Sequence, residues 1–178
     1  MTSETKNIYI VLSQTGTVPS KLIRLFTGAE YNHASISLTK DLNDMYSFGR
    51  RNPYNPFWAG FVRENPASGT FKRFPNTKAV VLEVEVGCDQ YEKLANVLEK
   101  MFSEQDRYHY NYLGLVLASC NISRKKDRCY FCSEFVGELL VKHKIVSKEE
   151  LPEIVTPMNF TELQFQQIYK GKLVDYKV

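Results

Sequence analysis

The chain has 178 residues, of which 43% are hydrophobic and 24% charged, and this composition fits one globular domain spanning residues 1–178. A formal net charge of +3 is too small to indicate a nucleic-acid-binding protein. The N-terminus is polar, and the longest apolar run, residues 112–120, is about half as long as a bilayer-spanning helix. We therefore expect a cytoplasmic protein with reduced cysteines, no transmembrane segment and no nucleic-acid partner.

The first half of the chain predicts a β-sheet. Residues 7–12 and 79–86 are apolar runs of the kind found in buried strands, and residues 21–26 predict a short helix between them. Residues 31–38 alternate, with His33, Ser35 and Ser37 on one face, and residues 45–49 return as the second strand of a hairpin. If residue 40 is the centre of the turn, His33 faces Ser47, although a change of register would alter this pairing.

Residues 50–76 are rich in proline, glycine, asparagine and aromatic residues. Connections of this length are often functional when they are ordered. One interpretation is a flap over a groove, with Phe57 and Trp58 as its contact surface. A surface insertion with one or two short strands explains the composition equally well, and both interpretations stay open.

The second half of the chain predicts helices. Asp89 is expected to cap a helix over residues 90–104, whose apolar stripe packs into the core, and residues 115–118 continue as a helical segment. A further helix starts near Cys132 and ends near residue 143 or 144. Short N-capped turns are expected at residues 147–150 and 156–163, and residues 173–178 predict a closing strand.

Cys132 is a candidate nucleophile because of its position at a helix start. Unpaired backbone N–H groups and the helix dipole favour negative charge there, so they stabilise a thiolate. A buried structural cysteine explains the same stretch, since free cysteines are among the most buried residues. The nucleophile hypothesis therefore needs a base, an orienting group and a donor for the oxyanion elsewhere in the chain.

The chain has three histidines that can supply the base. His33 lies on the alternating strand beside two serines and is the first choice, although a histidine on a strand is commonly structural. His109 lies in a tyrosine-rich segment and is the second choice. His143 is eleven residues from Cys132 on the same helix, about three turns away, which is too far for a base.

Cysteine spacing allows two other interpretations. Cys129 and Cys132 form a C-x-x-C pair, but a structural zinc site usually needs a second closely spaced ligand pair, and Cys88 and Cys120 are isolated. A thioredoxin-like motif needs a strand before it within a βαβ unit, whereas the predicted strands cluster in the first half. We also find no glycine-rich phosphate loop and no H-E-x-x-H motif, so we expect no metal and no cofactor.

The order of these motifs resembles a known family. A strand carries Asn32-His33-Ala-Ser-Ile, a following strand carries Tyr-Ser47-Phe, and a later aromatic stretch covers residues 110–114. The helix then reads Cys132-Ser-Glu-Phe-Val, with Thr-Pro downstream at 156–157. Over roughly residues 8 to 160, this pattern resembles the circularly permuted branch of the NlpC-type, papain-like cysteine hydrolases (YiiX-like proteins), with lecithin–retinol acyltransferases as more distant relatives. In that branch the histidine strand precedes the cysteine helix, as it does here.

The resemblance implies a fold and a set of site residues. The fold is an α+β papain-like one, with a small antiparallel sheet packed against the Cys132 helix and the 90–104 helix. Cys132 is the implied nucleophile, His33 the base and Ser47 the third, orienting residue. Relatives often carry an acidic, amide or second histidine group at the Ser47 position, and Glu64 is the alternative orienting group. Four residues are expected in oxyanion stabilisation or binding: Ser133 through its backbone N–H, Gln14, Trp58 and Glu64.

The implied reaction is acyl transfer by a cysteine hydrolase of the amidase or peptidase kind. A small peptide, amide or acyl substrate would form an acyl-thioenzyme on Cys132 that water then releases. Two alternatives remain open. One is an acyltransferase of the lecithin–retinol type, and the other is a catalytically weak ligand-binding module on the same fold, which the serine at position 47 favours.

Overall fold

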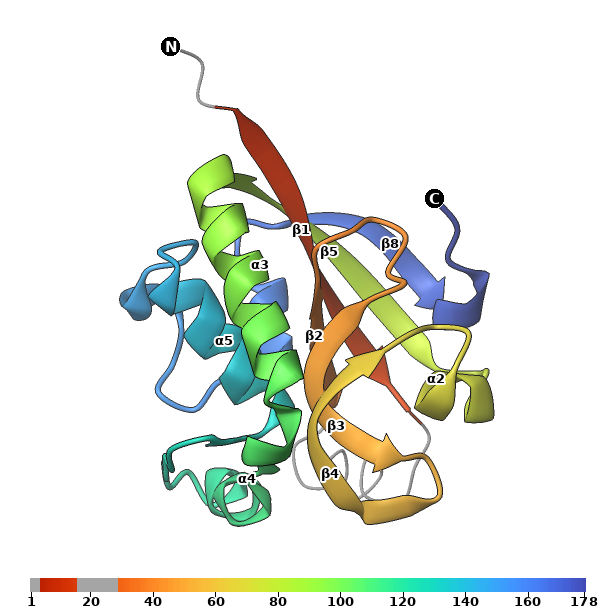
Figure 1. Cartoon of the computed structure of the whole chain (residues 1–178), viewed down its shortest axis with the longest axis vertical. Coiled ribbons are helices and arrows are strands. Elements are labelled where there is room, and N and C mark those ends of the chain that lie inside the picture. The colour runs from red at the N-terminus through yellow and green to blue at the C-terminus, as the bar shows by residue number, and fades with distance from the viewer. Residues whose placement is uncertain (1–3, 16–28) are drawn as a thin grey trace.

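The computed structural model describes residues 4–15 and 29–178. Within these residues the chain forms an eight-stranded sheet with the order β7-β6-β4-β3-β2-β1-β5-β8. Helices α3 (Cys88–Ser103) and α5 (Cys132–Lys142) lie together on one side of the sheet, and the short helix α2 (Gly69–Arg73) lies away from them (Figure 1). The predicted α+β class is therefore confirmed.

The sheet is larger than expected, and it is mixed. Its neighbouring strands are antiparallel except at one edge, where β6 and β7 run parallel. The strands are β1 (Thr5–Gln14), β2 (His33–Ser37), β3 (Met45–Asn52), β4 (Asn55–Glu64), β5 (Lys78–Gly87), β6 (His109–Tyr110), β7 (Cys129–Tyr130) and β8 (Gln166–Lys172). The remaining elements are α4 (Tyr112–Ser119) and the 3-10 turns η1 (Gln105–Arg107), η2 (Lys148–Glu150), η3 (Pro157–Thr161) and η4 (Leu173–Asp175).

Most of the predicted elements are found close to their expected places. The strands at 7–12, 31–38, 45–49 and 79–86 correspond to β1, β2, β3 and β5, and the helical segment at 115–118 lies within α4. Helix α5 ends at its C-cap His143, and Thr156 is the N-cap of η3. The short helix expected at residues 21–26 lies outside the described residues.

Two expectations about element boundaries are wrong. Helix α3 starts at Cys88 with Gly87 as its N-cap, because the Gly87 N–H donates to the Gln90 side chain, and Asp89 instead pairs with Lys93 at 2.7 Å. The closing strand lies earlier, over residues 166–172, because the buried Leu173 turns the chain into η4. Of the two interpretations of residues 50–76, the structure favours the one with strands, since they contain β4 as well as α2, although β4 is a ten-residue strand rather than a short one.

The core has two parts, one on each face of the sheet. On the first face, α5 and α3 bury apolar side chains against β1, β2 and β3, including Phe135, Val136, Leu94 and Leu98. The expected apolar stripe of the 90–104 helix is thereby confirmed. On the second face, Phe71 of α2 packs in a smaller cluster beneath β1, β3 and β5. Among the described residues, no helix has the length and apolar character required to cross a membrane.

The β2–β3 hairpin has a different register from the one expected. Ile36 pairs with Tyr46 and Ser37 with Met45, so continuing this register places Ser47 opposite Ser35. His33 therefore does not face Ser47 directly. The difference is two residues, so the serine and the histidine still lie on the same face of the sheet.

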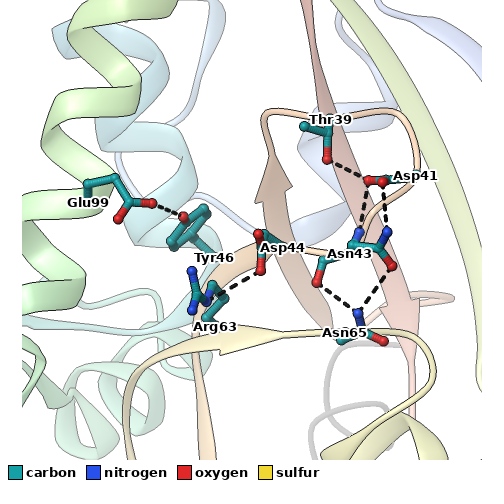
Figure 2. A network of polar contacts seen from close by, with 8 residues as sticks. All are labelled: Thr39, Asp41, Asn43, Asp44, Tyr46, Arg63, Asn65 and Glu99. Atoms are coloured by element: carbon teal, nitrogen blue, oxygen red, sulfur yellow. Dashed lines mark hydrogen bonds and ion pairs between the residues drawn. The ribbon is translucent and has the colours of Figure 1, made fainter.

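The hairpin turn also anchors the end of β4. Asp41 accepts hydrogen bonds from Thr39 and Asn43, which closes the turn (Figure 2). The side chain of Asn65 then donates to the Asn43 carbonyl oxygen at 2.8 Å. Because Asn65 directly follows Glu64, this bond fixes where β4 ends and holds Glu64 beside the neighbouring strands.

Candidate active site

Cys132 is the first residue of α5, as the sequence predicts. Its N-cap, Phe131, is extended, and the Phe131 N–H donates to the Glu134 carboxylate at 3.3 Å. The Ser133 hydroxyl donates to the carbonyl of Val155 at 2.7 Å and ties the first turn to a distant loop. The Cys132 side chain is 4% exposed at this helix end.

His33 meets Cys132 from the opposite end of the sequence. It is the first residue of β2 and pairs with Ser13 of β1. The Cys132 sulfur lies 3.9 Å from the carbonyl oxygen of Asn32, the residue before the histidine. The Cys132 thiol is close enough to the His33 ring to raise the pKa of the imidazole. The two residues expected to act together are therefore in contact.

Glu64 contacts the other side of the His33 ring. Its Oε2 atom lies 2.9 Å from His33 Nε2. The same oxygen accepts hydrogen bonds from the Ser35 and Ser47 hydroxyls, each at 2.8 Å. The carboxylate occupies Nε2 of the ring, so Nδ1 is the nitrogen that remains available to the Cys132 thiol.

Gly49 makes room for the glutamate. Glu64 on β4 reaches β2 by passing across β3, where Gly49 lies. A Cβ atom at residue 49 would stand 3.0 Å from Glu64 Oε1 and 3.3 Å from Ser47 Oγ. The absence of a side chain on Gly49 is therefore what lets the carboxylate reach the histidine.

The electrostatics of this cluster favour an ionised pair. Burial alone would lower the pKa of His33, but the charge of Glu64 and the hydrogen bonds to Cys132 and Glu64 raise it well above its ordinary value. Burial alone would raise the pKa of Glu64, but His33 and the hydroxyls of Ser47 and Ser35 lower it. An imidazolium beside the Glu64 carboxylate is therefore stabilised at neutral pH.

Ser47 has a different place from the one expected. It is fully buried, and it donates to Glu64 rather than accepting a bond from His33. The two-residue difference in hairpin register accounts for this change, because it leaves space for Glu64 between the two side chains. Ser35, whose position on the His33 face was recognised, is a second support for Glu64 that the sequence analysis did not identify.

The other predicted binding residues lie around this cluster. Trp58 is 55% exposed and lines a cavity of about 570 Å³ that Glu64 and Phe71 also line. The Phe71 ring centre lies 6.4 Å from that of His33. Gln14 ends β1, and strand alternation points it to the side of the sheet that α5 covers. Phe57 is 84% exposed.

Tyr110 is a neighbour of Cys132 that the sequence analysis did not single out. Burial raises the pKa of its phenol well above the ordinary value, and the nearby charge of Cys132 raises it further. Its ring centre lies 4.7 Å from that of Tyr112. Tyr110 begins the aromatic stretch 110–114 of the family resemblance, but nothing in the sequence assigns this tyrosine a place beside Cys132.

The remaining histidines and cysteines lie elsewhere. His109 is exposed on β6 beside Cys129 of β7, and His143 is the C-cap of α5. The four cysteines are free thiols. Within residues 4–15 and 29–178, no group of three or more histidine, cysteine or acidic side chains is arranged to hold a metal ion.

No family model matches this chain, and no curated protein matches it at a significant level. Among solved structures, it is similar to the crystal structure of YiiX from Escherichia coli O157:H7, which is described as a metalloprotein of the family DUF1105. The two chains are 15% identical, with a TM-score of 0.54 over 94% of this chain and 98% of YiiX. At this identity the similarity concerns the fold alone. The chain therefore has a YiiX-like α+β fold.

Proposed function

We propose that this protein is a thiol hydrolase with the circularly permuted, papain-like arrangement of the NlpC-type enzymes. One observation carries the proposal, namely the contact of the His33 ring with the Cys132 thiol on one side and the Glu64 carboxylate on the other. In this assignment Cys132 is the nucleophile and His33 the acid and base. Glu64 replaces Ser47 as the residue that orients the histidine, and the two serines hold Glu64.

The first half of the reaction forms an acyl-enzyme. The Cys132 thiolate attacks the carbonyl carbon of an amide, ester or thioester, and a C–S bond forms as the carbonyl becomes an oxyanion. The His33 imidazolium donates its proton to the leaving group as the bond to that group breaks. Glu64 stabilises the ring whenever it is protonated, because the carboxylate lies 2.9 Å from Nε2.

The second half releases the acyl group. Neutral His33 takes a proton from water, whose oxygen attacks the thioester carbonyl. The carboxylic acid leaves, and the Cys132 thiolate and His33 imidazolium are restored. The oxyanion of both steps would be stabilised by the backbone N–H groups of Cys132 and Ser133 at the start of α5. Gln14 at the end of β1 is the candidate side-chain donor.

Hydrolysis and acyl transfer share this acyl-enzyme and separate only at the second step. If an amine or alcohol replaces water, the same residues form an acyltransferase. The third possibility, a catalytically weak binding module, was suggested by the serine at position 47. Because the His33 ring contacts the Glu64 carboxylate, the serine at position 47 is no longer an argument for weak catalysis. We therefore favour a catalytically active enzyme.

Alkylation of the cysteines by iodoacetamide tests the proposal. Cys120 is exposed and Cys132 is 4% exposed, so accessibility alone predicts that Cys120 reacts first. We expect the opposite order, with Cys132 reacting faster and keeping its reactivity below pH 7, because His33 stabilises the thiolate. Peptide mapping by mass spectrometry gives the rate at each cysteine, and Cys120 serves as the internal reference.

The variants His33→Ala and Glu64→Gln complete the test. His33→Ala should reduce Cys132 to the reactivity of an ordinary buried thiol, and circular dichroism should report an unchanged fold. Glu64→Gln should lower the pKa of His33, so the reactive range of Cys132 should shift in pH. The hydrolase proposal is rejected if Cys132 in the unmodified chain reacts more slowly than Cys120 at every pH, or if His33→Ala changes nothing.

A further inference from the structure

Arg50 is a partly buried cation without an acidic partner. It lies on β3, and within residues 4–15 and 29–178 no carboxylate forms an ion pair with it. Its arginine neighbours differ in this respect. Arg51 pairs with Asp106 at 2.8 Å, and Arg63 pairs with Asp44 at 3.4 Å. A partly buried charge without a counterion is unfavourable, so Arg50 needs an explanation.

A second arginine makes this arrangement less favourable still. Burial lowers the pKa of the Arg50 guanidinium, and the positive charge of the nearby Arg73 lowers it further. Arg73 is held in place by the Tyr54 ring, 4.1 Å from its guanidinium carbon, and by a hydrogen bond to the Pro53 carbonyl. Two like charges fixed near each other destabilise the unliganded protein, and an anion between them would relieve the repulsion.

Arg50 also lies next to the candidate active site. It lines the same cavity of about 570 Å³ as Glu64 and Phe71. Its charge also affects the pKa of Tyr110, and the pKa of that phenol is affected in turn by Cys132. The unpaired guanidinium therefore lines the cavity that reaches Glu64, the partner of His33, and a substrate that extends from this cavity towards Cys132 can contact it.

We propose that Arg50, assisted by Arg73, binds an anionic group of the acyl substrate beside Cys132. The substrate class is therefore an amide, ester or thioester that carries a carboxylate or a phosphate close to the reacting carbonyl. Guanidinium groups bind both anions through paired N–H donors. This inference rests on the proposed thiol hydrolase function, and it assigns Arg50 as a specificity-determining residue.

The charge of the alkylating reagent provides a test that needs no known substrate. In both reagents the Cys132 thiolate displaces iodide and forms a thioether, but iodoacetate carries a carboxylate and iodoacetamide does not. The ratio of their rates at Cys132 therefore measures attraction of an anion to the site. The His33 imidazolium contributes to this ratio in every variant, so the informative quantity is the change caused by Arg50→Gln.

We expect Arg50→Gln to lower the iodoacetate-to-iodoacetamide ratio at Cys132 by about tenfold, the size expected for one charge-assisted contact. The iodoacetamide rate is measured for each variant, so that any change in the reactivity of the thiolate itself cancels in the ratio. Arg50→Lys should keep most of the ratio. Arg107→Gln is the matched control, because it removes one positive charge from an exposed arginine that pairs with Glu104.

The outcomes separate this inference from the proposed function. If Cys132 reacts rapidly with iodoacetamide but Arg50→Gln and Arg107→Gln give the same ratio, the anion site is rejected and the hydrolase proposal stands. If Cys132 is not activated towards iodoacetamide, the hydrolase proposal fails first. Inorganic phosphate and acetate, added as competitors, distinguish the two anions. The anion that slows alkylation of Cys132 only when Arg50 is present is assigned as the group that this site binds. If it slows alkylation equally in the Arg50→Gln variant, the result contradicts the site.

Discussion

Glu64 Oε2 lies 2.9 Å from His33 Nε2, although the two residues are 31 positions apart and β3 runs between their strands. The contact forms because β4 ends beside the β2–β3 turn and because Gly49 on β3 has no side chain in the way. Two hydroxyls of the intervening hairpin then hold the carboxylate. The predictions below test each part of this arrangement.

The first prediction concerns the pH dependence of stability. The pKa of Glu64 is lowered from 4.5, so its contribution is fully present above pH 4.5 and is lost as the pH falls through its folded-state pKa. The pKa of His33 is raised above 6.5, so its contribution is fully present below pH 6.5 and is lost as the pH rises through its folded-state pKa. The stabilisation by this pair should therefore be greatest between pH 4.5 and 6.5.

Urea unfolding of the unmodified protein and of Glu64→Gln, repeated from pH 3 to pH 10, measures this effect. We expect Glu64→Gln to lower the free energy of unfolding by about 3 kcal/mol within the window, because it leaves a buried charge unpaired. The difference in the free energy of unfolding between the two proteins should become smaller below and above this pH window. A difference that is the same at every pH would contradict the pairing.

The second prediction concerns the space at Gly49. In Gly49→Ala the new methyl group would push the Glu64 carboxylate away from His33, since its Cβ lies only 3.0 Å from Oε1. We expect the iodoacetamide rate at Cys132 to fall by about tenfold to a hundredfold, as is usual when an active-site group is displaced. Gly87→Ala is the matched control, because its Cβ would make an ordinary 3.5 Å contact with Gln90. Equal rates in the two variants would show that Glu64 does not depend on this space.

The third prediction separates the support of Glu64 from general packing. Ser47→Ala removes a hydroxyl that lowers the pKa of Glu64, so the acid-side loss of stability should begin at a higher pH. The free energy of unfolding should fall by about 2 kcal/mol, typical of a hydrogen bond to a charged group. Ser37→Ala is the control, because the Ser37 hydroxyl bonds only its local turn at Thr39. If both variants lose stability at the same pH, Ser47 has no specific effect on Glu64.

Local patterns were sufficient to predict much of the scaffold. Alternation placed His33 and Ser35 on one face of a strand, and helical spacing placed Cys132 at the start of a buried helix. These features depend on neighbours within a few residues, which a single sequence contains. The structure of residues 50–76 could not be predicted in the same way. This segment contains prolines and exposed aromatic residues, which are typical of loops, and the buried apolar residues of its strand β4 that indicate a strand are Phe61 and Val62.

The sequence by itself determined the candidate nucleophile, the candidate base and the elements that carry them. Only the tertiary structure decided which group lies on the far side of the His33 ring. The register of β2 against β3 places Ser47 two residues away from the position opposite His33. The pairing of β4 with β3 places Glu64 between the side chains of Ser47 and His33. Register and strand order are set by packing across the whole sheet and by the Asp41 turn, so no local pattern around Glu64 contains them.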